Sequence, residues 1–206
     1  DSNFMRNKSS FSLLVLGFIS LLLLAKPVLG SQSILLLGDS LSASLGMQQK
    51  DGWVVLLNNK FKQKNIDLNI VNASISGETT SGGLSRLPQI LAENKFDYLL
   101  VELGGNDGLR GFKPSLIENN LLQIIALAKQ HQTKVLLMEI QIPPNYGPRY
   151  TKTFTNIYPR VAEKTGATLL PFFIEHIAVD SNLMQADGIH PTNEAQPLIA
   201  EFMLNL

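Results

Sequence analysis

The segment Ile34-Leu35-Leu36-Leu37-Gly38-Asp39-Ser40-Leu41 decides how this chain is expected to fold. Its four leading apolar residues are too few for a helix of their own and predict a buried parallel strand. Gly38 and Asp39 end the apolar run, so Ser40 comes at the carboxyl end of the strand, where open α/β sheets bind ligands. Ser40 can therefore project its hydroxyl into a crevice beside the first amides of a following helix. The alternative is that Ser40 is only the N-cap of that helix.

Apolar segments downstream alternate between strand and helix patterns. Strands are predicted at 68–73, 97–103, 134–139 and 168–170, and helices at 53–61, 84–91, 114–128, 150–165 and 192–204. Strands interleaved with helices pair in parallel through right-handed crossovers, so the pattern predicts an α/β fold, a three-layer α/β/α sandwich with a five-stranded sheet. Residues 78–83 and the Pro-rich segment 142–148 are predicted to be loops, and Trp53 is predicted to be a core residue.

Composition limits the classes of protein to which the chain can belong. The 206 residues carry 17 Lys and Arg against 17 Asp and Glu, so no basic surface for nucleic acid is expected. The absence of cysteine excludes disulfides, thiolate catalysis and cysteine-ligated metals. Residues 31–206 are enough for one sizeable core and are predicted to form a single domain.

Residues 1–30 are predicted to be a leader with a signal peptide that starts at Met5. Arg6 and Lys8 precede an apolar run from Phe11 to Ala25, and small residues follow up to Gly30. A positive start, an apolar middle and a small-residue exit are typical of a secretory signal. The alternative is a membrane anchor, but the run is shorter than the roughly 20 residues that span a bilayer. We therefore expect export to a bacterial periplasm, a mature start near Ser31 and no stable membrane anchor.

Two glycine-containing loops follow predicted strands and supply candidate hydrogen-bond donors. Gly77 comes after the polar stretch 72–76, and Asn106 follows Gly104 and Gly105. The Gly77 backbone N–H can approach a ligand closely because no side chain intervenes, and a tight turn can display the Asn106 amide. The alternatives are a glycine needed only for a positive φ angle and an Asn that satisfies its own backbone.

The last predicted loop contains Asp187-Gly188-Ile189-His190-Pro191 and completes a possible reaction centre. A hydroxyl becomes a good nucleophile when a base takes its proton, and imidazole exchanges protons near neutral pH. His190 would be that base, and Asp187 would orient it and stabilise its charged form. The N–H groups of Ser40 and Gly77 and the Asn106 amide would form the oxyanion hole. The alternative, a metal pair, lacks the further ligands that a site requires.

The order of these motifs resembles that of the GDSL, or SGNH, hydrolase family. Its four blocks correspond to Gly38-Asp39-Ser40-Leu41, to Gly77 after Asn72-Ala73-Ser74, to Gly104-Gly105-Asn106-Asp107 and to Asp187-Gly188-Ile189-His190-Pro191. The resemblance implies a flavodoxin-like sheet, a Ser40 nucleophile served by Asp187 and His190, and the same oxyanion donors. It also implies hydrolysis of acyl thioesters, lysophospholipids and aryl esters without a cofactor or metal, and a loop at 78–83 that moves when substrate binds.

The expected function is therefore that of an exported serine esterase and thioesterase, acting as a monomer. The residues expected to contact substrate are Asp39, Leu41, Glu78, Leu109, Pro143 and Tyr146. One alternative is a carbohydrate or small-ester deacetylase of the same family, which would have a short polar pocket. The other is a catalytically inactive lipid-binding protein.

Overall fold

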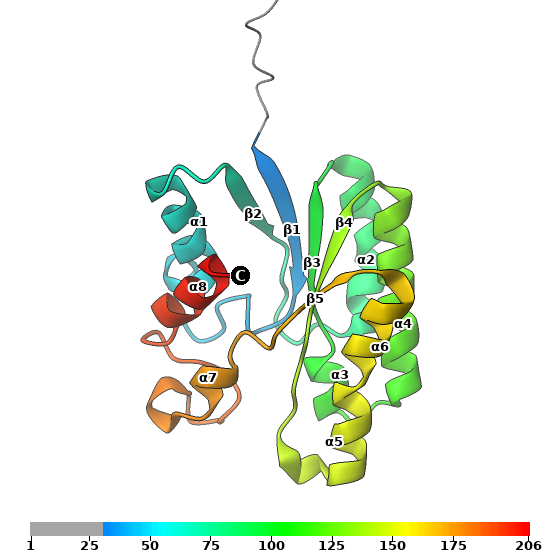
Figure 1. Ribbon diagram of the computed structural model, residues 1–206. Coiled ribbons are helices and arrows are strands. Elements are labelled where there is room, and N and C mark those ends of the chain that lie inside the picture. The colour runs from blue at the N-terminus through cyan, green and yellow to red at the C-terminus, as the bar shows by residue number, and fades with distance from the viewer. Residues whose placement is uncertain (1–30) are drawn as a thin grey trace, which may run out of the picture. The chain divides into compact units, whose positions relative to one another are not determined.

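A parallel sheet forms the middle layer of the computed structural model, which describes residues 31–206 (Figure 1). The predicted signal peptide lies outside the described residues. The five strands are arranged in the order β2-β1-β3-β4-β5. Their bounds are β1 Gln32–Gly38, β2 Leu68–Asn72, β3 Tyr98–Glu102, β4 Lys134–Met138 and β5 Thr168–Leu170. This flavodoxin-like order confirms the predicted fold class and places a topological switch point at β1.

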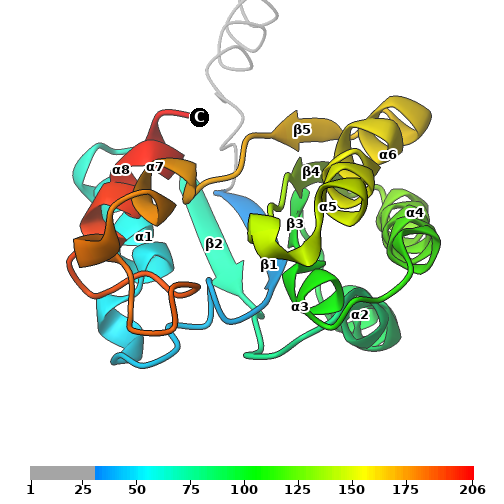
Figure 2. The ribbon, with the colours of Figure 1, turned by 90° about the horizontal axis from the view of Figure 1, so that it is seen from below.

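Helices cover both faces of the sheet (Figure 2). One face carries α1 and α8, and the other carries α2, α4 and α6. The helices are α1 Trp53–Gln63, α2 Thr80–Glu93, α3 Gly105–Leu109, α4 Pro114–Gln130, α5 Pro148–Thr155, α6 Ile157–Thr165, α7 Glu175–Ala178 and α8 Gln196–Leu204. Short 3-10 helices occur at Gln49–Asp51, Pro144–Tyr146 and Ser181–Leu183. Within residues 31–206, no helix has the length and apolar character needed to cross a bilayer.

The core is built around β1 and β3. Leu35, Leu36 and Leu37 are fully buried because the central strand has neighbours on both edges and helices on both faces. Trp53 is also buried, and its ring lies 5.5 Å from that of Phe173. The prediction that Trp53 belongs to the core is therefore confirmed.

The helix expected directly after Ser40 is absent from the structure. Residues 40–46 form successive turns, in which the Asp39 carbonyl accepts hydrogen bonds from the N–H groups of Ser42 and Ala43. Ser44 and Gly46 have positive φ angles of 59° and 80°, which a right-handed helix cannot contain. The alternative role of Ser40 as the N-cap of a helix is therefore excluded, and the expectation that amides of a following helix lie beside Ser40 was wrong.

The loop predicted at 78–83 is largely the first turn of α2. The Thr79 side chain accepts a hydrogen bond from the Gly82 N–H and caps the helix. Gly82 and Gly83 serve close packing: an added Cβ would lie 1.9 Å from a Glu78 carboxylate oxygen at Gly82 and 2.4 Å from Leu103 Cδ1 at Gly83. Glycines that suggested mobility in the sequence instead let the helix approach its neighbours.

Two predicted helix boundaries were wrong because of proline. The helix expected at 150–165 is divided at Asn156 into α5 and α6, because Pro159 has no N–H to donate to the carbonyl one turn earlier. The closing helix begins at Gln196 and not at Thr192, and Pro197 occupies its first turn.

Candidate active site

The structure brings together the three residues predicted as catalytic, although Ser40 and His190 are 150 positions apart. Ser40 Oγ lies 2.8 Å from His190 Nε2, and His190 Nδ1 lies 2.6 Å from Asp187 Oδ2. An ionised carboxylate only accepts hydrogen bonds, so Nδ1 carries the proton and Nε2 of the neutral ring is free to accept from the Ser40 hydroxyl. This is the tautomer that a general base needs.

The loop that carries Asp187 and His190 is fixed by its own hydrogen bonds. Asp187 Oδ1 accepts from the N–H groups of Ile189 and His190 at 2.9 and 3.0 Å. Gly188 makes the turn between them with a φ of 67°. The Gln185 N–H donates to the His190 carbonyl at 2.7 Å and holds the far side of the loop. The aspartate thus orients both the imidazole ring and the backbone that bears it.

The Asp187 carboxyl is suited to remain ionised. Partial burial raises its pKa, but hydrogen bonds from the His190 ring and from the backbone of His190 and Ile189 outweigh that effect and lower the pKa to about 2. Asp187 therefore keeps its negative charge over the working range of an imidazole base.

Three groups that can stabilise an oxyanion face the same cavity. Ser40, Gly77 and Asn106 follow β1, β2 and β3, so all three lie at the carboxyl edge of the sheet. Within residues 31–206, the N–H groups of Ser40 and Gly77 donate no hydrogen bond. The Asn106 side-chain amide donates one hydrogen bond to Asp39 Oδ2, at 3.1 Å, which leaves its second N–H for a ligand.

A buried polar cluster ties together the two loops that supply Gly77 and Asn106. Asp107, next to Asn106, accepts from the N–H and hydroxyl of Thr80 at 2.9 and 2.6 Å. Asn120 on α4 donates to the same Thr80 hydroxyl at 2.9 Å. Arg110 also donates to the Gly77 carbonyl at 3.2 Å. These bonds set the position of the backbone amide at Gly77 relative to the amide of Asn106.

Replacing Asn106 with alanine is expected to lower kcat for ester hydrolysis by about 10²–10³-fold, because one donor to the developing oxyanion is lost. The KM should change little, since the oxyanion exists only in the transition state. Steady-state kinetics on a p-nitrophenyl ester would measure both values. Asn119→Ala, at an exposed position of α4, is the matched control and should retain wild-type kinetics. Equal rates for N106A and wild type would remove Asn106 from the oxyanion hole.

The cavity beside Ser40 has a volume of about 490 Å³ and a mostly apolar lining. Four of the six predicted substrate contacts line it: Asp39, Leu41, Leu109 and Pro143. Glu78 and Tyr146 do not line it. Glu78 is held by Arg86 at 2.6 Å and lies over α2, and the Tyr146 hydroxyl donates to the Leu109 carbonyl at 3.0 Å. Tyr146 therefore supports a lining residue from behind.

Several lining residues carried no signal in the sequence. They are mainly apolar: Leu45, Ile140, Phe172, Ile174, Ala178 and Met184. Ile142 and Pro144, from the Pro-rich loop predicted at 142–148, also line the cavity. Apolar residues in loops cannot be told from core residues by periodicity. Within residues 31–206, no group of three or more His, Asp or Glu side chains is arranged to hold a metal ion.

A pair of buried carboxyl groups behind the nucleophile was also missed. Asp39 and Glu102 are only 3% and 1% exposed. Burial raises the pKa of Asp39 from 3.8 to about 6. Burial raises the pKa of Glu102 well above 4.5, and the nearby charge of Asp39 raises it further. The sequence signal was a charged residue at the last position of an otherwise apolar strand, two residues before Gly104.

This pair should make the stability of the protein depend on pH. A carboxyl whose pKa is raised by folding stabilises the native state below its unfolded pKa, and that contribution is lost as pH rises through the folded pKa. Between pH 4 and 7, the free energy of unfolding of wild type should therefore fall by about 2 kcal/mol relative to that of the double variant D39N/E102Q, as follows from the Asp39 shift alone. Urea unfolding of both proteins across this range would measure the difference. A difference that stays constant with pH would contradict the prediction.

Comparison with known proteins identifies the family and the relatives that this chain resembles. Residues 36–197 match the GDSL-like Lipase/Acylhydrolase family. The sequence is 46% identical over 190 residues to a Pseudomonas aeruginosa protein named Esterase TesA, covering 92% of this chain and 94% of that protein. It is also 46% identical over 188 residues to the Escherichia coli K12 protein named Thioesterase 1/protease 1/lysophospholipase L1, covering 91% and 89% of the two chains.

A solved structure agrees with both the sequence match and the fold. The psychrotrophic esterase EstA from Pseudoalteromonas sp. superposes with a TM-score of 0.83 and is 46% identical, covering 84% of this chain and 95% of that chain. The similarity therefore extends over nearly all of the described residues and includes the segments that carry the site. The chain belongs to the GDSL-like lipase/acylhydrolase family, as its sequence motifs predicted.

Proposed function

We propose that this protein hydrolyses carboxylic esters and thioesters of fatty acids through an acyl-enzyme formed on Ser40. The observation that carries the proposal is the hydrogen-bonded series Ser40–His190–Asp187, which opens on an apolar cavity of about 490 Å³. That volume is within the usual range for small-molecule sites, and its lining suits a hydrocarbon chain. The relatives named esterase and thioesterase support the same chemistry.

In the first half-reaction, Ser40 Oγ attacks the carbonyl carbon while His190 Nε2 takes the hydroxyl proton. Asp187 stabilises the resulting imidazolium, and the donors of Ser40, Gly77 and Asn106 bind the oxyanion. Collapse of the tetrahedral intermediate breaks the bond to the alcohol or thiol, which receives its proton from His190. In the second half-reaction, His190 takes a proton from water, and the hydroxide attacks the acyl carbonyl carbon. Collapse of this intermediate breaks the bond to Ser40 Oγ, which takes the proton back from His190 as the fatty acid leaves.

A series of p-nitrophenyl esters and acyl thioesters of increasing chain length tests this proposal. We expect kcat/KM to rise from acetyl to octanoyl, because each methylene buried in an apolar pocket stabilises the complex by about 0.8 kcal/mol. A preference for acetyl esters would instead favour the deacetylase alternative, whose pocket would be short and polar. A fluorophosphonate probe that failed to label Ser40 would favour an inactive lipid-binding protein.

We further propose that the protein is exported to a bacterial periplasm and acts there as a monomer. The support for export is the order of charged, apolar and small residues between Met5 and Gly30. Mass spectrometry of the exported protein should find a mature start near Ser31. An exported form that retains residues 5–30 would contradict signal cleavage, and analytical ultracentrifugation would test the monomer.

The proposed substrates in the cell are acyl esters and lysophospholipids rather than acyl-CoA. An exported enzyme meets little acyl-CoA, so hydrolysis of thioesters is a capability of the site that follows from its mechanism. The serine attacks either carbonyl in the same way, and the thiol is the better leaving group. Comparing lysophospholipid with acyl-CoA at equal chain length would test this ranking through kcat/KM.

A further inference from the structure

Glu102 is an ionisable residue whose presence the mechanism above does not explain. It is the last residue of β3 and lies opposite Gly38 of β1 in the sheet register. Its Oε2 accepts from the Asp39 N–H at 3.2 Å and from the Ser42 hydroxyl at 2.7 Å. A Cβ at position 38 would lie 2.6 Å from this oxygen, so β1 must carry glycine beside the carboxyl group. The sheet thus makes room for an acid in its interior.

The surroundings of Glu102 favour its uncharged form. Within residues 31–206 it has no salt bridge, and its Oε1 and the Ser74 hydroxyl are both buried without a hydrogen-bond partner. A buried charge without a partner is strongly unfavourable, and such groups take up a proton instead. Burial raises the pKa of Glu102, and the nearby charge of Asp39 raises it further, whereas hydrogen bonds from the Leu41 N–H and the Asn106 amide offset part of the rise at Asp39. The proton of the pair therefore resides on Glu102.

Asp39 connects this acid to the oxyanion hole. Its Oδ1 accepts from the Leu41 N–H at 3.0 Å, and its Oδ2 accepts from the Asn106 amide at 3.1 Å. Gly105 lies so close that an added Cβ would be 3.2 Å from Oδ2. Glu102 thus holds the backbone of Asp39, and the side chain of Asp39 holds the amide that faces the cavity.

We propose that Glu102 is a positioning residue for ester hydrolysis: as a buried carboxylic acid it holds Asp39, which holds the Asn106 amide with one N–H directed at the oxyanion. This role rests on the function proposed above. A carboxylate on Asp39 fixes the nitrogen side of Asn106 toward itself, because only that side donates. Without Glu102, the N–H of Asp39 and the hydroxyl of Ser42 would lose their acceptor in the interior.

Glutamine and leucine at position 102 separate this role from a purely structural one. Glutamine can accept from the Asp39 N–H and the Ser42 hydroxyl as Glu102 does, so E102Q should keep kcat within about threefold of wild type. Leucine can accept neither of these hydrogen bonds. The kcat of E102L should therefore fall roughly 100-fold with KM nearly unchanged, as for a weakened oxyanion donor. The matched control is Glu118→Leu on α4, where Glu118 is paired with Arg160 and Lys164 away from the site; its kcat should not change.

A double-variant comparison tests whether Glu102 acts through Asn106. If it does, E102L/N106A should be no slower than N106A alone, because the amide to be positioned is already absent. If the losses of kcat in E102L and N106A instead multiplied in the double variant, Glu102 would not act through Asn106. An E102L variant with kcat within threefold of wild type would overturn the positioning role itself.

An infrared measurement keeps the proposal testable if E102L does not fold. The wild-type-minus-E102Q difference spectrum at neutral pH should contain the carbonyl stretch of a protonated carboxyl group. A carboxylate band in its place, or a loss of kcat in E102Q as large as that expected for E102L, would overturn the acid form. Failure of the proposed function is distinguishable, because wild type itself would then hydrolyse no ester.

Discussion

Replacing Ser40 with alanine is expected to lower kcat for p-nitrophenyl octanoate by roughly 10⁶-fold, the scale found when a triad nucleophile is removed. The expectation follows from the 2.8 Å contact between Ser40 Oγ and His190 Nε2, since the alanine variant has no oxygen to form the acyl-enzyme. The residual rate should still exceed that in water, because the donors of the oxyanion hole remain.

The variant should fold as wild type does. The Ser40 side chain makes no hydrogen bond within residues 31–206 other than that to His190, so its loss leaves the core unchanged. Equal urea midpoints for S40A and wild type would establish this, and Ser115→Ala, at an exposed position of α4, is the matched control for activity. Substantial activity in a folded S40A protein, or labelling of it by a fluorophosphonate, would assign the nucleophile to another residue.

Replacing His190 with alanine should cost about as much in kcat as S40A, because a serine hydroxyl without a base remains protonated. The two groups act as a unit, so the double variant S40A/H190A should be no slower than either single variant. His131→Ala, an exposed histidine at the end of α4, should have wild-type kcat. If the effects of S40A and H190A multiplied, the two residues would act independently.

The pH dependence of activity offers a second test of His190. The base works only as neutral imidazole, so kcat/KM should fall as the solution becomes acidic. Asp187 does not contribute to this loss, because its pKa of about 2 keeps it ionised throughout the range in which imidazole titrates. A D187N variant should therefore be slower at every pH of this range. An activity loss that disappears in D187N would assign the acidic limb to the aspartate instead.

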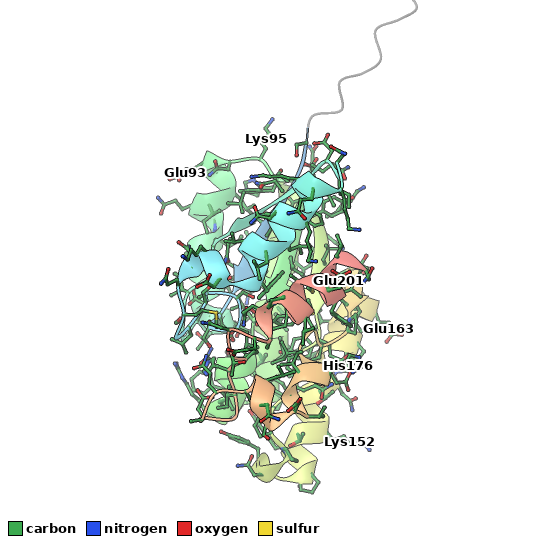
Figure 3. The ribbon with its side chains drawn as sticks, turned by 90° about the vertical axis from the view of Figure 1, so that its left-hand side faces the viewer. Glu93, Lys95, Lys152, Glu163, His176 and Glu201 are labelled. Atoms are coloured by element: carbon green, nitrogen blue, oxygen red, sulfur yellow. The ribbon has the colours of Figure 1, made fainter. Side chains whose placement is uncertain are left out.

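His176 is a histidine that the sequence analysis did not assign to the catalytic site. It lies on α7 (Figure 3), and its ring centroid is 5.9 Å from that of Phe202 on α8. An apolar context beside Glu175 predicts a structural or surface residue at this position, and the side chain is exposed. In the sequence, His190 is distinguished from His176 as the candidate base by the Asp-x-x-His spacing and by the proline after His190.

Much of the fold was predictable because the patterns that indicate buried strands and helices depend on residues close together in the sequence. The apolar runs at 34–37 and 98–101 have the length and composition of central strands, and their alternation with helices leaves few topologies. The predictions of local structure failed where contacts between segments distant in sequence decided the conformation. The first turn of α2 is stabilised because Asp107 of α3 accepts from the Thr80 N–H and hydroxyl, which no pattern within 78–83 could reveal.

The sequence by itself determined the class of fold, the family and the order of the reactive groups, because strand periodicity, glycine turns and the Asp-x-x-His spacing depend only on neighbours along the chain. The tertiary structure alone decided how the groups meet: which residues line the cavity, that Glu78 and Tyr146 do not, and that Glu102 and Asp39 share one buried environment. The physical reason is that cavity walls and pKa shifts arise from atoms distant in sequence, whose proximity exists only after the sheet has formed.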